Sequence, residues 1–179
     1  MAAAGHESPF EDEVLADALY ARAVLGGAEV VPHLLTAATA RLDDEDAHVR
    51  VAAAYAAVEG CRVLGESPGP LAEKLAALAA SAEPNERAAL VLAMGDLGLS
   101  PREYLSDPHP GVRACAALAP GLAPDEAATA EILVALADPA ACDDWFGTPP
   151  PQIRGRMRFT LVAAGIERIK DFNRLLPAA

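Results

Sequence analysis

The sequence predicts an all-α protein in which about four to five helical hairpins stack into an α-solenoid. Alanine dominates the composition while aromatic residues make up only 4% of it, so close-packed helices with small side chains must form the core. The 15 prolines and 13 glycines divide the helix-forming stretches into many short segments. A short motif also recurs at intervals close to the length of a two-helix repeat, and 179 residues suffice for four to five such units.

Proline and glycine positions set the expected helix boundaries. Five prolines lie at or just before expected helix starts, where a missing N–H leaves no helical hydrogen bond unmade: Pro68, Pro84, Pro110, Pro124 and Pro151. Three glycines lie where C-terminal caps are needed: Gly26, Gly65 and Gly98. The expected helices are 11–25, 29–41, 47–60, 69–80, 84–98, 101–105, 110–119, 125–137, 151–164 and 167–176. We expect residues 1–10 to be a flexible tail and residues 11–179 a single repeat domain.

The recurring motif is an acidic or proline-containing turn, a branched apolar residue, an arginine and an alanine-rich helix. The clearest copies are residues 46–55 and 107–118, and weaker copies are residues 83–90 and 153–157. The interval before the third copy leaves only residues 101–105 for a first helix. The interval before the fourth copy contains an extended turn from Asp138 to Pro151.

This pattern resembles the HEAT-repeat family, whose second helix begins with Asp-x-x-Val-Arg and continues with alanines at helical spacing. The resemblance covers about residues 30–176. It implies a right-handed HEAT-like solenoid that binds a protein or peptide partner. The sequence departs from the family pattern at Glu86, which replaces an apolar residue, and at Pro120, which ends the third copy's helix early.

One candidate binding surface is a row of bulky apolar residues at the same position of each copy. Stacking of the second helices would align these side chains along the inner surface, where they could take up a partner helix or peptide. The row consists of Tyr55, Leu92, Leu118 and Phe159. Alternatively, each side chain is half-buried against the neighbouring repeat.

A second candidate is the long loop that carries Trp145, the only tryptophan, and Phe146. It could project onto a partner, or it could fold back as a lid over the last hairpin. Through this loop the chain could instead be an accessory subunit of an enzyme or biosynthetic complex.

The repeated arginines are expected to be structural. We predict a ladder of inter-repeat contacts from Arg50, Arg87, Arg113 and Arg154 to the acceptors Asp46, Asp107 and Asp138. A local basic patch is formed by Arg154, Arg156, Arg158, Arg168 and Lys170. The patch could meet an acidic partner, although a solvated helix face is the favoured interpretation.

Catalysis and cofactor binding are not indicated. No nucleotide-binding, zinc-protease or hydrolase motif occurs, and the histidines His6, His33, His48 and His109 fall in unrelated contexts. We therefore expect no catalytic residues, no metal and no cofactor, with a HEAT-like enzyme as the remotest alternative.

The net charge and the cysteine content limit which partners and which cellular compartment are expected. A formal charge of −12 makes nucleic acid an unlikely partner. Three scattered cysteines without a CxxC pair, together with the lack of a signal-like or membrane-spanning segment, are consistent with the cytoplasm and with no membrane contact. The first expected helix, 11–25, has no preceding partner helix, so it could also support a homo-oligomer.

Overall fold

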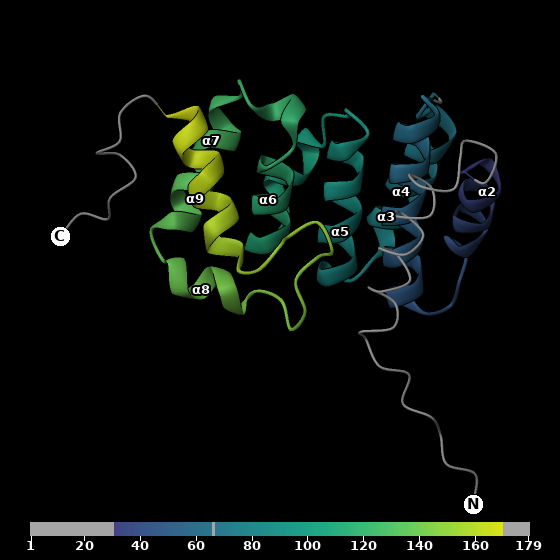
Figure 1. Ribbon diagram of the computed structural model, residues 1–179. Coiled ribbons are helices and arrows are strands. Elements are labelled where there is room, and N and C mark those ends of the chain that lie inside the picture. The colour runs from purple at the N-terminus through teal and green to yellow at the C-terminus, as the bar shows by residue number, and fades with distance from the viewer. Residues whose placement is uncertain (1–30, 66, 170–179) are drawn as a thin grey trace, which may run out of the picture. The chain divides into compact units, whose positions relative to one another are not determined.

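The computed structural model describes residues 31–65 and 67–169 (Figure 1). These residues form eight α-helices and two short 3₁₀ helices and contain no strand, which confirms the all-α prediction. The chain divides into two compact units between Ser67 and Pro68, and each is described by itself. That residues 11–179 form one domain stays a prediction. The expected tail 1–10 and helix 11–25 lie outside the described residues.

The first unit contains α2 (Val31–Arg41) packed on α3 (Ala47–Leu64). The side chain of Asp46 caps α3 by accepting the N–H of His48 at 2.8 Å, and this hydrogen bond lowers the pKa of Asp46. Gly65 ends the helix in the left-handed conformation with φ 63°, which glycine adopts without steric cost. Gly60 permits the close approach of α2, because an added Cβ would lie 3.2 Å from the Leu35 Cβ.

The second unit packs its helices in chain order (Figure 1). Helix α4 (Gly69–Ser81) lies on α5 (Pro84–Asp96), which contacts α6 (Pro110–Ala117). Helix α6 packs on α7 (Glu126–Leu136), and α7 packs on α9 (Met157–Arg168). Helix α8 (Pro139–Asp144) contacts both α7 and α9. The 3₁₀ helices are η1 (Arg102–Ser106), which contacts α6, and η2 (Pro120–Leu122).

Small residues let these helices approach closely. Residues 88–95 of α5 are all buried, and a Cβ on Gly95 would lie 2.9 Å from the Cβ of Ala119. Helix α6 buries Val112 and Cys115 completely, and the same core includes Ile132 of α7 and Leu161 of α9. With Cys142 of α8, the core thus joins five helices with few large side chains.

The C-terminal part differs from the expected helices. The expected helix 151–164 is wrong at both ends, because α9 begins at Met157 and continues to Arg168. Residues 147–156 are not helical, since the chain passes through a run of prolines and then Gly155, whose φ is 90°. The expected extended turn contains helix α8. The later part of the expected helix 167–176 lies outside the described residues.

No helix in the two described ranges combines the length and the apolar character needed to cross a membrane.

The start of α7 is fixed by a charged cap, Asp125. Its carboxylate accepts the N–H groups of Ala127 and Ala128 at 2.8 and 3.2 Å and the Nε of Arg102 at 2.7 Å. The bond from Arg102 and the backbone bonds lower the pKa of Asp125. A lowered folded-state pKa contributes stability above the unfolded pKa of about 3.9, and that stability is lost as the pH falls through the folded value.

We therefore expect Asp125→Asn to lower stability at pH 7 and to have a smaller effect near pH 3, which is below the unfolded pKa, so that part of the contribution of the charge is lost. Urea unfolding at both pH values measures the two differences. Glu73→Gln, which removes an exposed carboxylate from α4, should have little effect at either pH. An equal effect of Asp125→Asn at both pH values would show that its charge contributes nothing.

Candidate functional site

The repeated arginines fold back onto the turns that precede their own helices. Arg50 donates through Nη1 to the carbonyl oxygens of Asp44 and Glu45 at 2.8 and 2.9 Å. Arg113 donates through Nη1 to the equivalent carbonyl oxygens, those of Asp107 and Pro108, at 3.0 and 3.3 Å.

Arg87 makes the same kind of bond, from Nη2 to the carbonyl oxygen of Ala82 at 2.6 Å. The arginine of the motif is thus explained by backbone carbonyls of the preceding turn, which lie outside the hydrogen-bond ladder of the helix and need a donor.

The turns themselves are closed by aspartates at matching positions. Asp44 accepts the N–H of Asp46 at 3.0 Å, and Asp107 accepts the N–H of His109 at 2.8 Å. Asp44, rather than Asp46, is therefore the counterpart of Asp107. The predicted acceptors Asp46 and Asp138 instead accept N–H groups of their own helices.

Two arginines also connect neighbouring elements of the second unit. Arg87 of α5 pairs with Asp107, in the turn before α6, at 2.8 Å, and only 6% of that aspartate side chain is exposed. Arg113 of α6 pairs with Glu131 of α7 at 2.9 Å. Arg154 is exposed and makes no hydrogen bond or ion pair with a described residue.

The predicted apolar row has four different environments. Tyr55 is half-buried in the first unit. In the second unit Leu92 is only 7% exposed, Leu118 is half-buried against the core, and Phe159 is 61% exposed. Leu92 therefore offers almost no surface to a partner, whereas Leu118 and Phe159 do.

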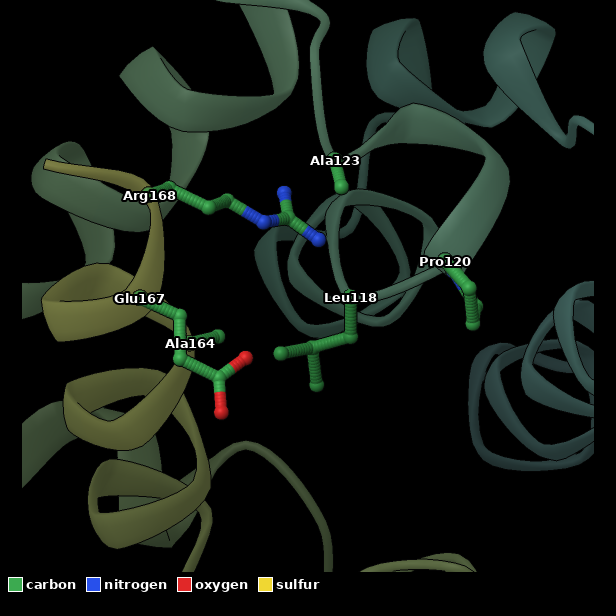
Figure 2. Close-up of a pocket in the computed structure, with 6 residues that line it drawn as sticks. All are labelled: Leu118, Pro120, Ala123, Ala164, Glu167 and Arg168. Atoms are coloured by element: carbon green, nitrogen blue, oxygen red, sulfur yellow. The ribbon is translucent and has the colours of Figure 1, made fainter.

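Leu118 lines a shallow depression of about 540 Å³ between the end of α6 and α9. Figure 2 shows its side chain directed toward α9, with the Arg168 guanidinium reaching across from that helix. Arg168 donates through Nη1 to the Ala117 carbonyl oxygen at 2.6 Å, and burial lowers the pKa of Arg168. The other lining residues are Pro120, Ala123, Ala164 and Glu167.

Phe159 belongs to an exposed apolar face of α9. Val162 and Ile166 lie three and seven residues further on, so they share this face, and they are 40% and 50% exposed. Met157, Leu161 and Gly165 fill the opposite, buried face. Sequence reasoning identified Phe159 alone, although the helical spacing of Val162 and Ile166 was readable. We define the α9 stripe as Phe159, Val162 and Ile166.

The loop that carries Trp145 and Phe146, here called the aromatic loop, folds back onto helices of the second unit. Phe146 is 8% exposed, stacks on His109 with ring centroids 5.7 Å apart, and covers Gly111 at the start of α6. Trp145 is half-buried against the same core. Further along, Gln152 donates to the Ala89 carbonyl oxygen of α5 at 3.4 Å. For Phe146 this geometry agrees with the alternative in which the loop folds back as a lid, and not with the one in which it projects onto a partner.

The cysteines are unsuited to nucleophilic chemistry. Cys61, Cys115 and Cys142 are free and buried. Burial, with a further contribution from Asp143 and Asp138, raises the pKa of Cys142 to about 11, and its Sγ donates to the Ala135 carbonyl oxygen at 3.0 Å. Burial also raises the pKa of Cys115. At neutral pH these two thiols stay protonated and are poor nucleophiles.

Across the described ranges, no three His, Cys, Asp or Glu side chains gather in a way that could hold a metal ion. Comparison of the chain with protein-family models, with curated proteins and with solved structures finds no match.

We expect Gly111→Ala to destabilise the second unit by about 2 kcal/mol, because the new Cβ would clash with the Phe146 ring at Cζ. Phe146→Ala should cost about 3 kcal/mol through the cavity that it leaves. In the double variant the methyl group occupies part of that cavity, so the total cost should be below the sum. Urea unfolding measures all three variants.

Gly147→Ala is the matched control, because a Cβ there would meet nothing within 4 Å. Strict additivity of the two single costs would contradict the packing of Phe146 on Gly111.

We expect Asp107→Asn to cost about 2 kcal/mol, since it keeps an acceptor for His109 but removes the charge that pairs with Arg87. Arg156→Met removes an exposed arginine that pairs with Asp143 at 3.4 Å and should cost about 0.5 kcal/mol or less. Chemical denaturation compares the two, and equal costs would mean that the Arg87–Asp107 pair is no stronger than a surface pair.

Proposed function

We propose that this chain is a non-catalytic protein-interaction module built as a HEAT-like α-solenoid. The observation that carries the proposal is the α9 stripe, an exposed apolar face on a helix whose opposite face is already buried in the core. A helix buried on one side has no structural need for a second apolar face, so the stripe favours a binding role.

The helix packing supports the solenoid part of the proposal. From α4 to α7 each helix of the second unit packs on the next α-helix in the chain, as expected for stacked repeats, whereas α7 packs mainly on α9. The arginine turns at Arg50, Arg87 and Arg113 recur at the starts of α3, α5 and α6, in line with repetition of one structural unit.

The binding surface that we propose is the α9 stripe, which contains Phe159 of the predicted row. Leu118 lies outside it, because it faces α9 beside Ala164, Glu167 and Arg168, on another side of the helix. The aromatic loop contributes less, because Phe146 is almost fully buried.

A pull-down from the source lysate tests the proposal. The double variant Phe159→Glu, Ile166→Glu places two charges in the stripe and should reduce recovery of specific partners at least about tenfold, the effect of roughly 1.4 kcal/mol. Val134→Glu is the matched control, because Val134 is a 62% exposed apolar residue on α7. Recovery of the same proteins by wild type and a folded double variant would overturn the proposed surface.

A further inference from the structure

The α9 stripe is narrow. It extends from Phe159 to Ile166, a rise of about 10 Å at 1.5 Å per residue, and its three partly exposed side chains offer on the order of 250 Å². A stable dimer of globular proteins buries about 800 Å² on each partner. A single amphipathic helix that places its own apolar side chains along α9 matches this size better than a second copy of the chain does.

Three arginines gather at the N-terminal end of the stripe. Arg156 is the residue before α9, and the Arg158 guanidinium lies 5.0 Å from the centre of the Phe159 ring. Both pair with one carboxylate, that of Asp143, at 3.4 and 3.3 Å. Arg154 has no such partner among the described residues.

This end of α9 therefore carries excess positive charge. The nearby Asp143 and Asp144 are two carboxylates against three guanidinium groups, in a chain whose net charge is −12. The helix dipole is also positive here, so arginines at this end oppose the stability of α9. Opposite charge on a bound partner would relieve that repulsion.

We infer that α9 binds a short amphipathic helix whose apolar side chains cover the stripe and whose acidic residues lie beside Arg154 and Arg156. The inference rests on the proposed function and names the partner's chemistry. Acidic peptides are favoured over anionic membranes because a short peptide meets only the arginine-rich end of α9, whereas an extended negatively charged lipid surface also faces other parts of the strongly negative chain.

Two labelled probe peptides test the inference. Each has about 15 residues, the length at which isolated helices begin to form, with leucines at i, i+3, i+4 and i+7. One carries three glutamates at one end, and the other carries three lysines in the same places. Fluorescence anisotropy should show at least about tenfold tighter binding of the glutamate probe.

Variants of the full chain separate the apolar and charged contributions. Phe159→Glu should abolish binding of both probes. Arg154→Glu, Arg156→Glu should reverse the preference between the probes, whereas Lys74→Glu, Arg62→Glu makes the same change in net charge on α4 and α3, outside α9, and should preserve it. Circular dichroism verifies that each variant is folded.

Equal binding of the two probes, or binding of neither, would overturn the inference. The proposed function would then still be tested separately by the pull-down. Tighter binding to vesicles of phosphatidylserine than to the glutamate probe would also overturn the inference. If the double variant Phe159→Glu, Ile166→Glu recovers the same partners as wild type in the pull-down, the proposed function itself is wrong.

Discussion

The close approach of helices with small side chains is the constraint on which the second unit depends. Gly95 leaves room for Ala119, and Gly111 leaves room for Phe146. Each alanine buries little apolar area, so stabilisation must come from many short-range contacts rather than from a few large side chains. A methyl group added at either glycine would separate elements that have no other bulky residue to fill the gap.

The same close packing explains why polar groups hold the helix starts. Where helices approach closely, the turns between them bring backbone carbonyls and N–H groups near the core, and these groups must be paired. Arg113 satisfies two carbonyls and one carboxylate with a single planar guanidinium. Lysine has one compact ammonium group and could not reach these acceptors in the same fixed geometry, which accounts for arginine at Arg50, Arg87 and Arg113.

The sequence predicted the fold class and several boundaries because proline and glycine act locally. Pro84 and Pro110 begin α5 and α6, and Gly65 ends α3, as expected from the backbone restrictions of these residues. The start of α9 was missed because tertiary contacts decide it. Ile153 is buried and Gln152 is bonded to α5, so the chain after the proline run is held in a non-helical path.

Part of the candidate site could be predicted from the sequence and part could not. Periodicity identified Phe159, but it could not show that Leu92 is buried, because α5 has neighbours on more than one side and residue spacing within one helix does not count those neighbours. The arginine motif was visible in the sequence. Its acceptors were misaligned, because Asp46 was matched with Asp107, although Asp44 is the aspartate that closes the turn before α3 as Asp107 closes the turn before α6.

The three buried cysteines can report how often the regions around them open. A protonated, buried thiol reacts with a labelling reagent only when the structure around it opens, so its labelling rate reports how often that region opens. Cys61 lies in the first unit, whereas Cys115 and Cys142 lie in the second. Labelling the native protein and identifying each modified cysteine by mass would therefore time the opening of the two units separately, without any substitution.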